Sequence, residues 1–114
     1  MLGGIALEST STLVGPMAVD AIGKMAFDRV FLGATGISAQ HGFSNSDLYE
    51  AELKRAAISR AAEVNIVADH TKFGEQVLVS FAALHQAHRL FTDRMPEGTL
   101  ARACEEAGLQ VVEC

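Results

Sequence analysis

Tryptophan is absent from this 114-residue sequence, which has one tyrosine and two cysteines. Two cysteines are too few for the disulfide framework of a small secreted domain. Cys104 and Cys114 also lack the paired spacing of a structural zinc site. We therefore expect reduced cysteines, no bound metal and a cytoplasmic setting.

Long apolar runs and basic residues are also scarce. No run approaches the about 18 apolar residues of a membrane-spanning helix, and Met1–Gly4 lacks the basic start of a signal peptide. Nine Lys and Arg stand against fourteen Asp and Glu, for a formal net charge of −5. Because an acidic domain repels phosphates, we expect the chain by itself to bind neither nucleic acid nor membrane.

The remaining composition is typical of one packed domain. Hydrophobic residues make up 49% and the mean hydropathy is +0.21. Domains commonly hold about 100–150 residues, so residues 1–114 are predicted to form a single domain.

Short runs of successive apolar residues are typical of strands that are covered on both faces, as in parallel sheets. Four such runs are predicted to be strands: Arg29–Gly33, Glu63–Asp69, Arg89–Asp93 and Leu109–Glu113. Two less regular segments, Ile5–Thr12 and Val77–Phe81, are predicted to be short strands.

Helical patterns alternate with these strands. Pro16 opens the first, because proline is tolerated in a helix's first turn. Ser44–Asp47 is predicted to cap a second helix that runs to about Ala62, with Leu53, Ala57 and Ala61 in its apolar stripe and Leu48 and Ala51 nearby. A third is predicted between Pro96 and Gly108. The alternation predicts an α/β fold: a Rossmann-like, mostly parallel sheet flanked by helices, with right-handed crossovers.

Ligands of open α/β sheets bind beyond the carboxyl ends of the strands. The first candidate loop there is Gly33–Ser38, in which Gly33, Thr35 and Gly36 bring backbone N–H groups close to an anion. The alternative is a tight turn with no ligand. The second is Ala68–Gly74, where Asp69, Thr71 and Lys72 offer an acceptor, a hydroxyl and a cation to a sugar phosphate. The alternative is a solvated loop with a local ion pair.

A third candidate is the predicted second helix, whose Glu52 or Lys54 would point across the sheet end towards Asp69 and Lys72. The alternative is an i,i+4 pair of Glu50 with Lys54. His85 and His88 are three residues apart but have no evident third ligand, and acids beside Cys104 make it a poor nucleophile. We expect no cofactor and no catalytic residue.

The order and spacing of several segments resemble the sensor domain of DeoR-type bacterial transcriptional regulators. These segments are Gly3–Gly4, Leu13–Pro16, Asp28–Ile37, His41–Ser44, Glu52–Ala56, Ala68–Phe73 and Phe91–Asp93. The resemblance implies a fold similar to ribose-5-phosphate isomerase, glucosamine-6-phosphate deaminase and the CoA-transferases. It also implies an effector that is a phosphorylated sugar or polyol. By this resemblance Asp69 and Lys72 line the effector site, Lys54 and Glu52 face it, and the Gly33–Gly36 loop forms part of its floor.

The sequence departs from that family in lacking a helix-turn-helix and the Asp-x-Gly-(S/T)-T loop that cradles phosphate. The chain is therefore interpreted as the C-terminal part of a sensor domain, which contacts DNA only through a domain that it lacks. An open sheet edge would favour a homo-oligomer. Two alternatives remain: a sugar-phosphate isomerase or deaminase with Glu52 as the base, which Lys54 disfavours, and a module for oligomerisation alone.

Overall fold

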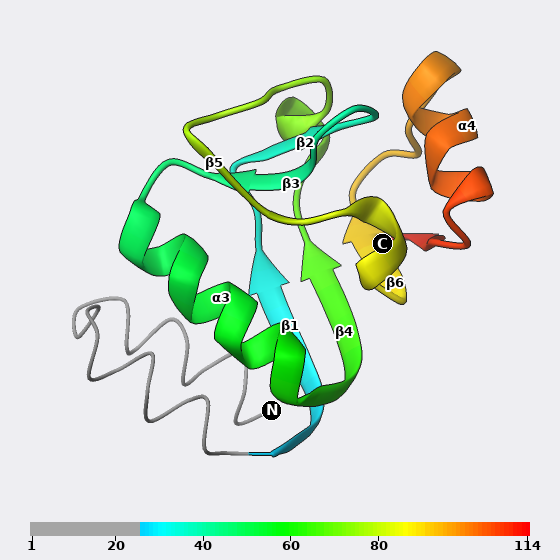
Figure 1. Ribbon diagram of the computed structural model, residues 1–114. Coiled ribbons are helices and arrows are strands. Elements are labelled where there is room, and N and C mark those ends of the chain that lie inside the picture. The colour runs from blue at the N-terminus through cyan, green and yellow to red at the C-terminus, as the bar shows by residue number, and fades with distance from the viewer. Residues whose placement is uncertain (1–25) are drawn as a thin grey trace.

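A four-stranded parallel sheet forms the centre of the computed structural model, which describes residues 26–114. Its strands are β1 (Phe27–Gly33), β4 (Ala61–Val67), β6 (Arg89–Thr92) and β7 (Gln110–Glu113), in the order β1-β4-β6-β7 (Figure 1). Every neighbouring pair is parallel. The four main predicted strands and the α/β class are thus confirmed, with strand ends shifted by a few residues.

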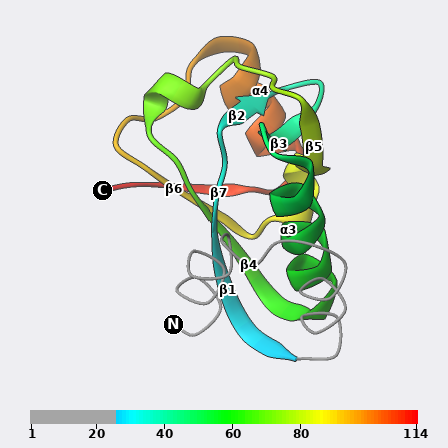
Figure 2. The same ribbon diagram turned by 90° about the vertical axis from the view of Figure 1, so that its left-hand side faces the viewer.

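The crossovers cover one face of this sheet. Strand order follows chain order, so right-handed crossovers all lie on the same side. Helix α3 (Leu48–Arg60) joins β1 to β4, and helix α4 (Gly98–Glu106) joins β6 to β7. Figure 2 shows α3 and strand β5 on the same side of β1 and β4. The buried side chains of this face form the core together with those of α3 and α4: Val30, Leu32, Val64, Ile66, Leu90, Ala51, Leu53, Ala57, Leu100 and Cys104.

Helix α3 begins and ends differently from the prediction. Its N-cap is Asp47, whose carboxylate accepts from the backbone N–H groups of Tyr49 and Glu50. Its end is Arg60, because Ala61 already pairs with β1, opposite Phe27. The prediction that Ala61 belongs to the helical stripe is therefore wrong, and Leu48 is 48% exposed. The pairing of Ala61 with β1 fixes the C-terminal end of α3, and local helix propensity does not reveal such a pairing.

A second, antiparallel sheet has three strands, of which two were not predicted from the sequence. It consists of β2 (Gly36–Ser38), β3 (Gly42–Asn45) and β5 (Val79–Ala82), in the order β2-β3-β5. Only β5 was anticipated, as Val77–Phe81. Ser44 and Asn45 were predicted to cap a helix, but they are buried in β3. Their short polar side chains carry no alternating apolar signal, so the pattern favoured a cap.

The third predicted helix is confirmed as α4, which begins two residues after Pro96. Gly108 follows its end with φ +75°, the left-handed conformation common after helices. The short 3₁₀ helices η2 (His70–Lys72) and η3 (Leu84–Gln86) flank β5 along the chain. The predicted strand Ile5–Thr12 and the helix opened by Pro16 lie outside the described residues. None of the helices between residues 26 and 114 has the length and apolar character needed to cross a bilayer.

Candidate functional site

Lys54 is held at the carboxyl end of β1. It comes from the middle of α3, and its Nζ donates to the carbonyl oxygen of Gly33 at 2.7 Å. The ammonium also lies 5.2 Å from the ring centroid of Phe81, a cation–π arrangement. Burial lowers the pKa of Lys54, and the nearby charge of Glu50 acts in the opposite direction. A positive charge is therefore held, partly desolvated, where the chain leaves the first parallel strand.

The Asp69 loop lies at the end of the neighbouring strand. Gly33 pairs with Val67, so the residue after Ala68 is beside the end of β1. The Asp69 carboxylate caps η2, accepting from the Thr71 N–H at 2.8 Å and from the Thr71 hydroxyl. These hydrogen bonds, more than the charge of Lys72, lower the pKa of Asp69. The register thus brings Lys54 and the Asp69–Lys72 loop to one edge of the sheet.

Asp93 joins this edge from the third parallel strand. Its Oδ1 accepts the backbone N–H of His70 at 2.7 Å, and its Oδ2 lies 2.8 Å from His70 Nδ1. One carboxylate therefore clamps both the backbone and the ring of His70 and ties the loops after β4 and β6 together. This pair was not assigned from the sequence. Asp93 directly follows β6, so the reasoning about strand ends that selected Asp69 would have found it.

The contact between Asp93 and His70 predicts that the stability of the fold depends on pH. The hydrogen bonds from His70 hold the pKa of Asp93 below its ordinary value in the folded chain. A carboxylate with a lowered folded-state pKa stabilises the fold above its unfolded pKa, and this stabilisation is lost as pH falls through the folded-state value. We expect Asp93→Asn to lower the free energy of unfolding near neutral pH and to have less effect at strongly acidic pH. Urea denaturation across that range measures both.

Asp28→Asn is the matched control for the loss of one carboxylate, since Asp28 is exposed at the start of β1, and only a small change in the free energy of unfolding is expected from it. Equal destabilisation by Asp93→Asn at all pH values would contradict the role of the ionised carboxylate.

The other predicted site residues make structural contacts. The Thr35 hydroxyl donates to the Ser44 carbonyl at 3.2 Å. Gly36 is buried in β2, where an added Cβ would lie 2.6 Å from the Glu75 carbonyl oxygen. Glu52 is half-buried on α3, two residues before Lys54. The contacts of Thr35 and Gly36 are those of the small antiparallel sheet, in which Gly36 pairs with Ser44, while their role in binding and that of Glu52 remain predictions.

A cavity of about 780 Å³ lies elsewhere, between the β2–β3 turn, β5, η3 and α4. None of the predicted effector residues lines it. Its polar groups include His41, Arg55, His85 and Glu106. Arg55 is already engaged, because its guanidinium donates to the Ser80 carbonyl. The cavity is thus distinct from the edge where Lys54 and Asp69 lie.

The histidines and cysteines have other partners or surroundings. The Nδ1 atom of His88 accepts the Val64 N–H at 3.0 Å. Burial raises the pKa of the Cys104 thiol, which agrees with the expectation of a poor nucleophile, but the cause is desolvation rather than neighbouring acids. Between residues 26 and 114, His, Cys, Asp and Glu side chains do not gather in groups of three or more suited to a metal ion.

The family model and the similar proteins point to the same family. Residues 1–94 match the sequence model of the DeoR C terminal sensor domain. The chain is 31% identical over 106 residues to the HTH-type transcriptional regulator IolR of Bacillus subtilis, covering 93% of this chain and 42% of that protein. It is 32% identical over 113 residues to the HTH-type transcriptional regulator GlpR of Haloferax volcanii, covering 99% and 44%.

A third relative is the glycerol-3-phosphate regulon repressor of Haemophilus influenzae, 30% identical over 114 residues, covering 100% of this chain and 44% of the repressor. The chain therefore spans less than half the length of these relatives. Two of them are named as regulators of transcription and the third as the repressor of a regulon. Because the family model matches residues 1–94, most of the chain, the chain belongs to the DeoR C-terminal sensor domain family.

Proposed function

We propose that this chain senses a phosphorylated sugar or polyol at the carboxyl edge of its parallel sheet. Lys54 and Lys72 contact the phosphate, and Asp69, Thr71 and Glu52 contact hydroxyl groups. Gly33, Thr35 and Gly36 shape the floor. No bond of the ligand is made or broken. Binding is coupled to the DNA affinity of a longer regulator, whose DNA-binding part lies outside this chain.

The observation that carries the proposal is the placement of Lys54. An ammonium group has three N–H donors, and one of them is directed to the Gly33 carbonyl. Burial makes its charge costly, which lowers its pKa. A phosphate at the strand ends offsets that cost and accepts the remaining donors. The neighbouring Asp69 loop adds an exposed carboxylate and hydroxyl, groups that bind sugar hydroxyls.

The relatives support the chemical class of ligand. One is named for a glycerol-3-phosphate regulon, and glycerol 3-phosphate is a phosphorylated polyol. It is small, has one phosphate and two hydroxyl groups, and so matches the mixture of cations and acceptors at this edge. We take it as the first probe.

Thermodynamic linkage couples the binding of the effector to the DNA affinity of the regulator. A ligand shifts an equilibrium only by its differential affinity for the two states. Moving a population from 1:99 to 99:1 requires about 5.5 kcal/mol of such preference. The His70–Asp93 clamp joins the loops after β4 and β6, so a ligand held by Asp69 and Lys72 acts on both loops.

Isothermal titration calorimetry of this chain tests the proposal. We expect saturable binding of glycerol 3-phosphate, ribose 5-phosphate or another sugar phosphate, and no binding of glycerol or ribose. We also expect the affinity for the sugar phosphate to fall as the salt concentration rises, because charge-assisted contacts are screened. If no phosphorylated compound of a broad sugar and polyol panel binds, or if the unphosphorylated controls bind equally, the proposal is wrong.

A further inference from the structure

The backbone of the η2 turn has no N–H group left for a ligand. The N–H of His70 donates to Asp93 Oδ1 at 2.7 Å. The N–H of Thr71 donates to Asp69 Oδ1 at 2.8 Å. The N–H groups of residues 72–75 all donate to backbone carbonyl oxygens of the chain. This turn therefore does not offer the cradle of backbone N–H groups with which many loops bind phosphate, and a phosphate beside it must be met by side chains.

His70 is a side chain of this turn that can donate to such an anion. Its Nδ1 lies 2.8 Å from Asp93 Oδ2, and 37% of the side chain is exposed. An ionised carboxylate only accepts hydrogen bonds, so Nδ1 is the protonated nitrogen. The two nitrogens of an imidazole ring point away from each other, which directs Nε2 away from Asp93. Within residues 26–114, Nε2 has no hydrogen-bond partner.

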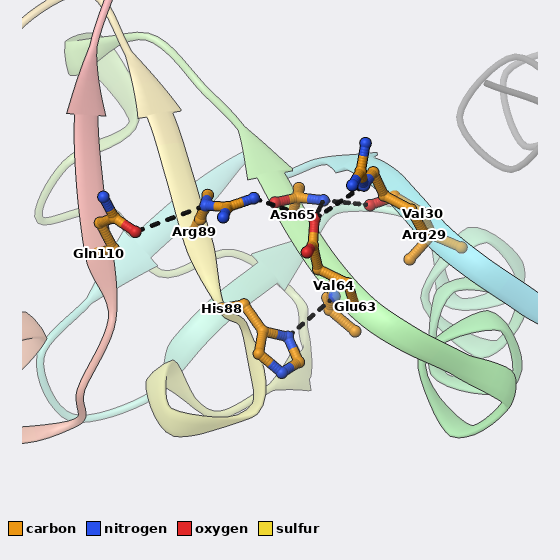
Figure 3. A network of polar contacts seen from close by, with 8 residues as sticks. All are labelled: Arg29, Val30, Glu63, Val64, Asn65, His88, Arg89 and Gln110. Atoms are coloured by element: carbon orange, nitrogen blue, oxygen red, sulfur yellow. Dashed lines mark hydrogen bonds and ion pairs between the residues drawn. The ribbon is translucent and has the colours of Figure 1, made fainter.

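His88 shows the opposite use of the same ring atom (Figure 3). Its Nδ1 accepts the N–H of Val64 at 3.0 Å, so this nitrogen must be unprotonated. A second proton on His88 would break that contact. In His70 the contact of Nδ1 survives protonation, because Nδ1 already donates to Asp93. His70 can therefore become an imidazolium, with Nε2 as a second donor, without losing its place in the fold.

The charged groups around His70 come from two loops. Asp93 follows β6, while Asp69 and Lys72 belong to the same turn as His70. Hydrogen bonds from Thr71 lower the pKa of Asp69 most, but the charge of Lys72 lowers it too and the charge of Asp93 raises it. These groups therefore lie within electrostatic reach of one another. Both carboxylates already accept hydrogen bonds from the chain, so an anion at this turn meets the cations.

We propose that His70 binds the phosphate of the effector through Nε2, and that Asp93 is the positioning residue that holds the ring. This inference rests on the proposed function, because it concerns the same edge of the sheet. The imidazolium donates from both nitrogens, from Nδ1 to Asp93 and from Nε2 to a phosphate oxygen. Because histidine changes its charge near neutral pH, the affinity for the effector depends on pH.

Isothermal titration calorimetry with glycerol 3-phosphate, at about pH 6 and about pH 8, tests this role. His70→Asn places an amide nitrogen near the position of Nδ1 and keeps a donor for Asp93, but has no group at the position of Nε2. We expect the wild type to bind about 10-fold more tightly than His70→Asn at the lower pH, the effect of one charge-assisted hydrogen bond. This advantage should shrink at the higher pH. The titration of the phosphate itself is common to both proteins and cancels in the ratio.

Two further variants sharpen the test. His85→Asn is the matched control, because His85 is exposed on η3 and lines the cavity away from this edge. It should bind like the wild type at both pH values. His70→Gln carries its amide nitrogen near the position of Nε2 and should bind more tightly than His70→Asn, but less tightly than the wild type at the lower pH. Circular dichroism checks that each variant folds.

The outcomes separate this role from the proposed function. Equal binding by the wild type and His70→Asn, in a chain whose affinity Lys54→Met lowers, overturns the role of His70 alone, as does an advantage that does not change with pH. If His70→Asn fails to fold, a His70→Gln variant that binds as tightly as the wild type at the lower pH overturns it. A wild-type chain that binds no sugar or polyol phosphate overturns both proposals, and so does loss of binding in His85→Asn with His70→Asn unaffected.

Discussion

Lys54→Met is expected to weaken the binding of glycerol 3-phosphate by about 10- to 150-fold, the equivalent of about 1.5–3 kcal/mol for a hydrogen bond to a charged group. Methionine keeps an unbranched stem beside Phe81, so the packing under the ammonium is largely retained. What is lost is the charge and the donor at the carboxyl end of β1. Isothermal titration calorimetry measures the change in Kd.

Arg102→Met is the matched control for charge. Arg102 is an exposed cation of α4, and its removal changes the net charge of the chain by the same amount as the Lys54 variant. We expect its Kd to stay within about twofold of the wild type, because exposed charges are screened by salt. Equal loss of affinity in both variants would mean that only the overall charge matters, and would contradict a local role for Lys54.

Gly42→Ala is expected to have the largest effect on stability, lowering the free energy of unfolding by about 2–5 kcal/mol. Gly42 has φ +71°, where an L-residue with a Cβ is strained by roughly 1–2 kcal/mol. Its added Cβ would lie 2.3 Å from the Ala82 carbonyl oxygen. That oxygen belongs to β5, which pairs with β3 and cannot move freely, so overpacking adds about 1–3 kcal/mol.

Gly74→Ala separates the backbone strain of a positive φ from the overpacking of an added Cβ. Gly74 has φ +79°, but an added Cβ there would meet nothing within 4 Å. We expect this variant to lose only the conformational part, about 1–2 kcal/mol. Urea denaturation of the two variants gives the difference. Similar losses for Gly42→Ala and Gly74→Ala would show that close packing of β3 against β5 is not a constraint.

The parallel sheet was predictable because its strands are encoded locally. Runs such as Val30–Leu32 and Ile66–Ala68 are apolar at successive positions, and this pattern is typical of strands within α/β proteins. The small sheet was not predictable in the same way. Gly36–Ser38 and Gly42–Asn45 are short and hold one large apolar residue each, Ile37 and Phe43, among small or polar ones. They become strands by pairing with each other and with β5. Their burial is a consequence of tertiary contacts.

The candidate site, too, could be predicted only in part from the sequence. Lys54 was a candidate from the predicted second helix and from the resemblance to the DeoR family. Strand ends and residue types were enough to make Asp69 a candidate, because the carboxyl edge of a parallel sheet can be located from sequence. They did not reveal that Lys54 contacts Gly33 and Phe81. Nor did they reveal that Asp93 clamps His70. Such contacts join residues more than twenty positions apart, and no local pattern specifies them.

The sequence by itself determined the α/β class, the strands of the main sheet and the helices α3 and α4, and it predicted the edge at which a ligand would meet the chain. Apolar periodicity, capping residues and glycine positions are local properties, and they carry that information directly. Only the tertiary structure decided which sheet face the crossovers within residues 26–114 cover and where each charge points. Those features depend on strand order, register and crossover handedness, which arise when distant segments pack together.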